Sequence, residues 1–316
     1  MKIILILGSG NCGASAFNDY LLAREDFQDL FHGGEFRLVN DPDGIDELYN
    51  GLYKNFSINT AANKVLNFKN FVNNLYNSEY NKKYNLYTKE LISTADNFIR
   101  NISYLNYNGS PQFFLDKMTI YEKMSFYLRR FLLRQNAKDI NLLNMTIPCS
   151  EEKFLEFAKN FIFDNFKSHK NFDKNKHIVI EQGGNYFNPI SSTKYYGENR
   201  QIIFVKRDPR AIFWSMKRRG SLSYPGHSVE LFTKWYVNIM ETINNQEINK
   251  VITIKFETFF ENFYDESKKL CDQLGIDKKI DSNFDLNHTL KNLYKFENNL
   301  SSYDKSYLEK NLKKYI

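Results

Sequence analysis

Cysteine and long apolar runs are scarce in this chain of 316 residues. The three cysteines, Cys12, Cys149 and Cys271, are odd in number and widely spaced, so they indicate neither a disulfide framework nor a metal-binding motif. We therefore expect no metal site. No stretch approaches the roughly 18 consecutive apolar residues that a membrane span needs, so we expect no span. These absences exclude small disulfide-stabilised domains, Cys-rich zinc modules and integral membrane proteins.

An excess of charge of one sign is also nearly missing. Lys and Arg number 43 against 37 for Asp and Glu, a formal net charge of +6. This mild and scattered excess suits an anionic cofactor or an acidic glycan and does not indicate a nucleic-acid partner. The N-terminal apolar run, residues 2–7, is short and has no cleavage-type sequence, so it predicts a first strand rather than a signal peptide. The expected localisation is cytoplasmic.

The most informative stretch is Q-I-I-F-V-K-R-D-P-R-A-I-F-W-S, residues 201–215. It opens with a short β-branched apolar run, which is typical of a buried strand in a parallel sheet. A helix follows, with Asp208 near its N-cap, Pro209 at its first position and Gly220 at its C-cap. A strand, a basic turn and a helix N-terminus together favour an anion site, in which Arg207 offers a planar fork of donors. The alternative is a surface turn with solvated charges.

A glycine-containing loop, residues 8–16, connects the first predicted strand to the first predicted helix. Glycines allow the backbone to approach a phosphate closely, and successive N–H groups can form an anion nest. The loop lacks the Lys-Ser/Thr ending of a Walker motif. Gly8, Gly10 and Gly13 do match the dinucleotide pattern G-x-G-x-x-G, so a dinucleotide oxidoreductase is one competing interpretation.

Together the two loops resemble those of sulfotransferases that use 3′-phosphoadenosine 5′-phosphosulfate (PAPS). Ser215 stands eight residues after Arg207, as in that family's 3′-phosphate motif. The stretch 251–260 and the later Leu274-Gly275 resemble the family's next strand and helix. The resemblance implies that the N-terminal loop holds the 5′-phosphosulfate and that a basic C-terminal loop closes over the 3′-phosphate. The cofactor-binding residues it implies are Ser9, Gly10, Asn11, Cys12, Gly13, Ala14, Ser15, Arg207, Ser215 and Lys295.

One position departs from the family pattern. Asn11 stands where the family has a basic loop residue that contacts the transferring sulfonate. Either another cation substitutes, with Lys206, Arg37 and Arg210 as candidates, or catalysis is weak, or the ligand differs. For Cys12, inside the same loop, a role as a small packing residue is the simpler interpretation.

The resemblance also suggests where a catalytic base lies. In some glycan-modifying members the base is a Glu just after the second strand, and Glu35 is the positional match. A brief second strand is expected around residues 35–39. His227, in a loop, is the next candidate. Another predicted strand, with residues 178–180 as its buried part, would bring Gln182 and Asn185 to the same edge of the sheet.

The predicted architecture is one α/β domain over residues 1–316. It has a central parallel sheet with helices on both faces, of the P-loop NTPase-like, sulfotransferase type, with a large helical insertion at about 51–176. Apolar stripes predict insertion helices over 60–76, 89–104, 119–134 and 151–166. The insertion would cap the sheet and could form the acceptor pocket. Further helices are predicted over 229–244 and from about residue 302.

The leading functional prediction is transfer of the sulfonate group from PAPS to an acceptor hydroxyl or amine on a saccharide or cell-surface glycan, with PAP as product. Glu35 or His227 would remove the acceptor proton. The alternatives are a nucleotide-dependent phosphotransferase and a non-catalytic nucleotide- or glycan-binding protein. The partner is a small-molecule or glycan acceptor. The sequence gives neither its identity nor the oligomeric state.

Overall fold

A computed structural model of the chain describes residues 1–316 except 135–142, 221, 245–249 and 279–282. The described residues form two compact units. The first comprises residues 1–36, 171–194 and 198–316, and the second comprises residues 37–170 and 195–197. Each unit is described by itself below.

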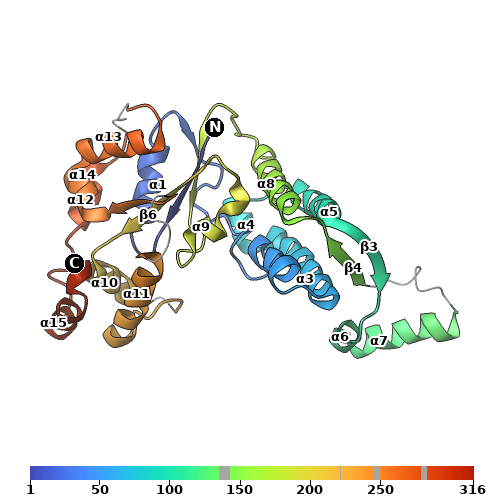
Figure 1. The fold of residues 1–316 in the computed structure, drawn as a ribbon. Helices are drawn as coiled ribbons and strands as arrows, with labels where there is room; N and C mark the ends of the chain where they lie inside the picture. The colour runs from blue at the N-terminus through green and yellow to red at the C-terminus, as the bar shows by residue number, and fades with distance from the viewer. Residues whose placement is uncertain (135–142, 221, 245–249, 279–282) are drawn as a thin grey trace. The chain divides into compact units, whose positions relative to one another are not determined.

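The first unit is built on a parallel sheet. Within the described residues its five strands lie in the order β2-β5-β1-β6-β7, and every neighbouring pair is parallel (Figure 1). The strands are β1 (Ile3–Leu7), β2 (Phe27–Gln28), β5 (His177–Glu181), β6 (Arg200–Lys206) and β7 (Ile252–Lys255). β1 is the central strand and is buried along its whole length, as its unbroken apolar sequence predicts. In its register Ile6 lies between Glu181 of β5 and Ile203 of β6.

Helices cover both faces of this sheet. The connection from β1 to β2 runs toward one edge and that from β6 to β7 toward the other. Right-handed crossovers therefore place α1 (Ala14–Leu22) on one face, and α10 (Pro209–Arg219) with α11 (Val229–Asn244) on the other. The remaining α-helices in the described part of this unit are α9 (Pro189–Ser192), α12 (Phe256–Glu261), α13 (Phe263–Leu274), α14 (Leu286–Asn292) and α15 (Ser302–Asn311), and a short 3-10 helix, η6 (Lys313–Tyr315), follows them. The predicted α/β class with a parallel sheet and helices on both faces is confirmed.

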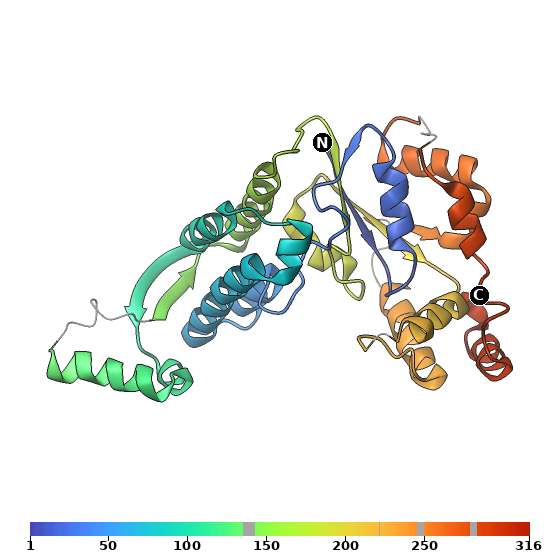
Figure 2. The same cartoon turned by 180° about the vertical axis from the view of Figure 1, so that it is seen from behind.

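Aromatic side chains fill the space between α1 and the helices that follow β7. Phe17 of α1 lies 4.7 Å from Phe259 and 5.1 Å from Phe260 of α12, measured between ring centroids. Tyr20, one turn further on, packs edge-on against Phe263 of α13. Burial of several rings in one cluster fixes α1, and with it the preceding loop, against α12. Figure 2 shows α1 beside these helices from behind.

The helix after β6 has the predicted ends. The Asp208 side chain accepts a hydrogen bond from the Arg210 backbone N–H at 2.8 Å, Pro209 occupies the first turn, and Gly220 closes the helix with φ 58°. α10 therefore begins directly at the end of β6 and aims its N-terminus at the carboxyl edge of the sheet.

The second unit is mainly helical, but it also contains an antiparallel pair of strands that the sequence pattern does not predict. Predicted insertion helices correspond to α3 (Ile58–Asn77), α5 (Glu90–Ile102), α7 (Ile120–Tyr127) with the π-helical turn η2 (Leu128–Leu132), and α8 (Glu151–Lys167). Shorter helices are α2 (Ile45–Tyr49), η1 (Asn50–Lys54), α4 (Glu79–Tyr84) and α6 (Gln112–Lys117).

The two strands of this unit form a pair: β3 (Ser103–Gly109) pairs antiparallel with β4 (Leu143–Pro148). β3 is largely exposed on both sides, so its sequence lacks the alternation that marks a strand.

The expected strand at residues 35–39 is wrong. The second strand is the two-residue β2, and residues 35–37 follow it without regular structure, leading into a turn. Within the second unit the Leu38 and Val39 carbonyls accept hydrogen bonds from Ile45 and Asp46 N–H groups. These turn bonds satisfy the backbone locally, so an apolar run that looks like a strand does not join the sheet. In the described part of the chain no helix is long and apolar enough to cross a membrane.

Candidate functional site

Two loops meet at the carboxyl edge of the sheet, where β1 and β6 end. In an open α/β sheet this edge, at the point where strand order reverses, is the ligand-binding position. The first loop runs from Gly8 to Gly13, and the second is the turn that contains Arg207. Asn11 (φ 63°) and Gly13 (φ 91°) both have left-handed backbone conformations, which gives the first loop its tight curvature before α1 begins.

The chain's own side chains close around the loop glycines. A Cβ at Gly10 would meet the Tyr224 ring, and a Cβ at Gly13 would meet the Phe256 ring. At Gly8 it would meet the Cys12 thiol. These positions therefore require glycine for internal packing, in addition to any close approach of a ligand. Burial raises the pKa of the Cys12 thiol to about 12, so Cys12 stays protonated and behaves as a packing residue.

Arg207 connects the two loops. Its Nη1 donates to the Asn11 carbonyl oxygen at 3.2 Å, and its guanidinium lies 4.6 Å from the centroid of the Phe256 ring. The Nε lies 4.0 Å from Glu257 Oε1, beyond hydrogen-bonding distance, and has no hydrogen-bond acceptor. Burial lowers the pKa of Arg207, but a guanidinium remains charged at neutral pH. A half-buried guanidinium at this position is suited to binding an oxyanion.

Two of the cations proposed to substitute for a basic residue at position 11 are engaged elsewhere. Arg210 forms ion pairs with Asp208 at 2.7 Å and with Glu309 at 2.9 Å. Arg37 pairs with Asp41 inside the second unit. Neither lines a cavity at the loops. Lys206, whose pKa is lowered by burial, does not line one either.

Two cavities open beside the loops, and all their lining residues belong to the first unit. The cavity that we call the carboxylate cavity measures about 300 Å³, and the one that we call the basic cavity measures about 360 Å³. They share Gly13, Ser15, Arg207, Ser215 and Arg219. The carboxylate cavity adds Gly10, Asn11, Cys12, Ala14, Glu35, Glu181, Gln182 and Tyr224. The basic cavity adds Ala16, Asp19, Trp214, Arg218, Phe256, His288, Thr289, Asn292 and Lys295.

The charges divide between the two cavities. The basic cavity is lined by Arg218 and Lys295 and by the shared Arg207 and Arg219, with Asp19 as the one carboxylate among its lining residues. Such a set of donors matches a phosphate-bearing ligand. Ser215, shared by both cavities, donates through its hydroxyl to Asn11 Oδ1 at 3.3 Å. The predicted pair Arg207 and Ser215 therefore does converge, with Asn11 between the two side chains.

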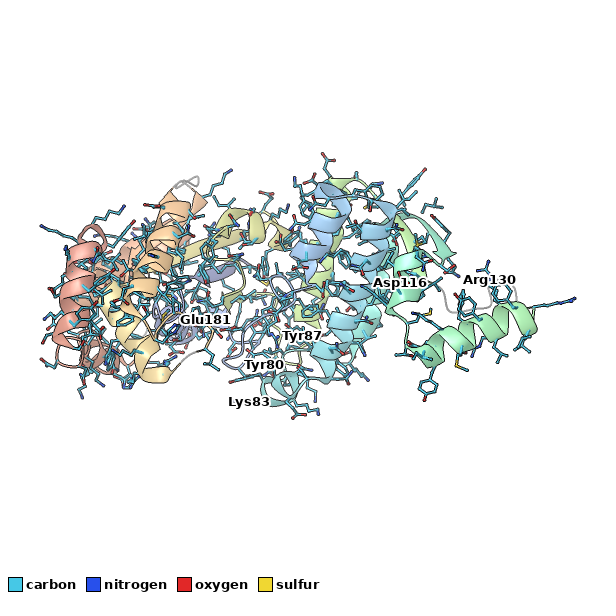
Figure 3. The ribbon with its side chains drawn as sticks, turned by 90° about the horizontal axis from the view of Figure 1, so that it is seen from below. Tyr80, Lys83, Tyr87, Asp116, Arg130 and Glu181 are labelled. Atoms are coloured by element: carbon cyan, nitrogen blue, oxygen red, sulfur yellow. The ribbon has the colours of Figure 1, made fainter. Side chains whose placement is uncertain are left out.

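Two glutamates line the other cavity. Burial, with smaller contributions from the nearby charges of Glu35 and Asp19, raises the pKa of Glu181 to about 7. Glu181, which is labelled in Figure 3, is the last residue of β5, and Glu35 follows β2 in the loop described above. A carboxyl that titrates near neutral pH, beside a second carboxylate, has the properties of a general acid–base group.

The other predicted site residues have mixed positions. Lys295 lines the basic cavity, whereas His227 is exposed and lines neither cavity. Ser9 is buried and accepts the Cys12 N–H at 3.0 Å through its backbone carbonyl. Sequence reasoning missed Glu181, Arg219 and Tyr224. Glu181 had a usable signal in the sequence, because it directly follows the predicted buried strand residues 178–180. Arg219 and Tyr224 had no such signal in the sequence, because only the folded chain brings them to the loops.

The chain is therefore an α/β protein with two cavities beside the loops at the carboxyl edge of its sheet. No family model matches this chain, and no curated protein matches it. Among solved structures it is similar to the sulfotransferase domain from the Synechococcus PCC 7002 olefin synthase, with 11% identity, 98% of this chain and 94% of that chain covered, and a TM-score of 0.44. It is also similar to the sulfotransferase domain from the curacin biosynthetic pathway, with 13% identity, 98% and 96% covered, and a TM-score of 0.40.

A third similar structure is sulfotransferase STF9 from Mycobacterium avium, with 8% identity, 99% of this chain and 76% of that chain covered, and a TM-score of 0.42. A likeness this distant leaves the activity to be inferred from the site itself.

Proposed function

We propose that this protein transfers a sulfonate group from PAPS to a hydroxyl or amine of a small-molecule or glycan acceptor. The observation that carries this proposal is Arg207, a half-buried guanidinium that lines both cavities at once. Its position suits the junction between a phosphate-bearing ligand in the basic cavity and a reacting centre in the carboxylate cavity. Such an arrangement fits a group-transfer enzyme better than a non-catalytic nucleotide-binding protein.

The residues present fit a nucleotide with a 3′-phosphate. Arg207, Arg218 and Lys295 supply cations, and Ser215 supplies a hydroxyl. Trp214 offers an aromatic surface in the same cavity. PAPS, when bound, supplies an activated sulfonate whose leaving group is the phosphate of PAP. The protein's contribution is to hold the phosphates, orient the sulfonate and accept a proton.

Arg219 is the residue that we propose in place of the basic loop residue. It lines both cavities, and its charge is close enough to Arg207 to lower the pKa of Arg207 further. A second guanidinium at this junction would stabilise negative charge that develops on the leaving phosphate. Asn11 then has a structural role, because its backbone and side chain receive hydrogen bonds from Arg207 and Ser215.

Glu181 is our proposed base, with Glu35 as its charged neighbour. The acceptor oxygen or nitrogen bonds to sulfur while the bond from sulfur to the phosphate oxygen breaks, and the acceptor proton passes to the Glu181 carboxylate. Since the base must be ionised, kcat/KM should rise through about pH 7, the pKa of Glu181. Glu35→Gln removes the repulsion between the two carboxylates, so it should lower the pKa of Glu181 and move the rise in kcat/KM to lower pH. An unchanged pH profile would show that Glu35 does not influence the base.

Binding of PAP by calorimetry tests the assignment. Arg207→Ala removes one charge-assisted contact, which corresponds to about ten- to hundredfold weaker binding. Arg210→Ala is the matched control, because Arg210 sits three residues away and is paired outside both cavities. Parent-like affinity in folded Arg207→Ala would contradict the site. A thermal-shift comparison of PAP with ATP, GTP and NAD separates the sulfotransferase from the phosphotransferase and dinucleotide alternatives.

Arg219 is tested by turnover. Arg219→Gln should reduce kcat by about tenfold or more. Arg218→Gln should mainly weaken PAP binding, because Arg218 lines only the basic cavity and lies over the Trp214 ring. Equal effects of the two variants on kcat would exclude the proposed role of Arg219.

A further inference from the structure

An apolar helix face in the second unit is exposed. α7 and η2 form one helical stretch over residues 120–132, opened by a capping box between Thr119 and Glu122. Ile120, Tyr121, Met124, Leu128, Phe131 and Leu132 are between 48% and 84% exposed. Their spacing follows one side of a helix. We call these six residues the apolar face.

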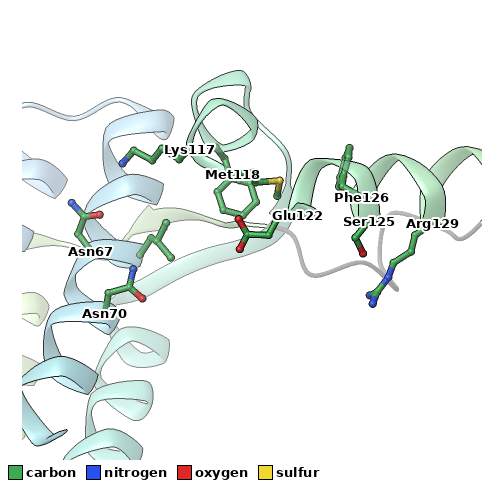
Figure 4. A pocket seen from close by; sticks show the side chains of 10 residues that line it. Asn67, Asn70, Lys117, Met118, Glu122, Ser125, Phe126 and Arg129 are labelled. Carbon is green, nitrogen blue, oxygen red and sulfur yellow. The ribbon is translucent and has the colours of Figure 1, made fainter. Parts of the chain in front are cut away.

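The polar side of the same stretch is turned toward the protein. Glu122, Ser125 and Arg129 line a cavity of about 550 Å³ together with Asn67 and other residues of α3 (Figure 4). Phe126 is the one buried residue of the stretch. A surface helix normally turns its apolar side inward. In the part of the second unit that the structure describes, the apolar face stays exposed, so it can bind a partner.

Positive charge accompanies the apolar face. Lys123 and Arg130 lie seven residues apart, which places them on one side of the helix, next to the apolar face. The guanidinium of Arg130 lies 5.8 Å from the Phe131 ring and 5.9 Å from the Phe126 ring. Figure 3 shows Arg130 projecting from this helix. Glu122 is the one acidic residue within residues 120–132, and its carboxylate accepts hydrogen bonds from Thr119. The face is therefore apolar with a basic flank.

We infer that this face binds the surface of an anionic membrane. An interfacial helix lays its apolar side among the acyl chains, while Lys and Arg reach the phosphates and Tyr sits at headgroup level. The thirteen residues of the stretch would extend about 20 Å, less than the roughly 30 Å hydrocarbon core. The helix would therefore lie on the membrane rather than span it.

Charge argues against a second copy of the chain on this face. In a symmetric dimer the same patch meets itself, so Lys123 and Arg130 would face each other's counterparts. The carboxylate of Glu122 is held by its own helix cap and does not neutralise them. An anionic lipid surface complements this charge. Because the surface lies wholly within the second unit, it is independent of the proposed chemistry.

Co-sedimentation of the full chain with vesicles tests the inference. The wild type should sediment with phosphatidylcholine vesicles that contain about one third phosphatidylglycerol, and should stay in the supernatant with phosphatidylcholine alone. Leu128→Ser with Phe131→Ser should weaken binding on the order of tenfold or more. The matched control is Phe56→Ser with Ile92→Ser, two exposed apolar residues elsewhere in the same unit.

The basic flank is tested in the same assay. Lys123→Gln with Arg130→Gln should weaken binding about fivefold for each cation, and added salt should do the same. Lys89→Gln with Lys153→Gln is the charge-matched control on exposed positions of the same unit. Failure of the wild type to bind anionic vesicles, or equal binding by the Leu128/Phe131 variant, would overturn the inference. Light scattering that shows a dimeric wild type and a monomeric Leu128/Phe131 variant would also overturn the inference, in favour of self-association.

Discussion

Replacing Glu181 by Gln should stabilise the protein, and more strongly as the pH rises. Folding raises the pKa of this carboxyl from 4.5 to about 7, mainly through burial. Between these two values the folded protein holds a proton that the unfolded chain has released. The free energy of unfolding therefore falls as the pH rises through this window, and above pH 7 the cost is about 3 kcal/mol. Glutamine has a similar shape and no titrating proton, so the variant avoids this loss.

Urea unfolding of both proteins at pH 5, 6, 7 and 8 measures the effect. The stability difference between Glu181→Gln and the parent should be smallest at pH 5 and should grow to about 3 kcal/mol at pH 8. Glu297→Gln, at an exposed carboxyl of the same unit, should show no such growth. A difference for Glu181→Gln that is the same at all four pH values would refute the assignment of a near-neutral pKa. It would also remove the main reason for choosing Glu181 as the base.

Two further changes test how the loops are held. Asp208→Ala removes the cap of α10 and one partner of Arg210, so thermal or urea unfolding should show a loss of about 2 kcal/mol; an unchanged stability would mean that solvent replaces both contacts. Gly13→Val combines a strained positive φ with a clash against the Phe256 ring, and should destabilise the fold by about 2 kcal/mol or more; a parent-like melting temperature would show that the ring moves aside freely.

The strand-and-loop motifs could be predicted from sequence because their signals are local. The buried strands β1, β5 and β6 are short apolar runs, and α10 carries its own start and stop signals in Asp208, Pro209 and Gly220. Parallel strands bring their carboxyl ends to one edge of the sheet. The convergence of the two loops could therefore be predicted, because each loop directly follows a predicted strand. The expected second strand failed for the complementary reason. The Ile45 and Asp46 N–H groups, seven residues further on, satisfy the Leu38 and Val39 carbonyls, and the apolar pattern of residues 35–39 alone does not indicate these bonds.

Which charges face the cavities was decided by the tertiary structure. Arg210 and Arg219 lie on the same helix and are equally basic in sequence, yet the first is paired with Asp208 and Glu309 while the second lines both cavities. Of the two partners of Arg210, Asp208 is local in sequence, whereas Glu309 lies about a hundred residues away in the chain.

The sequence by itself determined the parallel sheet, the glycine loop and the spacing of Arg207 and Ser215, since each depends on neighbouring residues. Only the folded chain made Glu181 a candidate base. Its titration near neutral pH comes from burial and from the charges of Glu35 and Asp19, which are distant in sequence. Desolvation and charge interactions act through space, so a pKa at this edge of the sheet is a property of the tertiary structure.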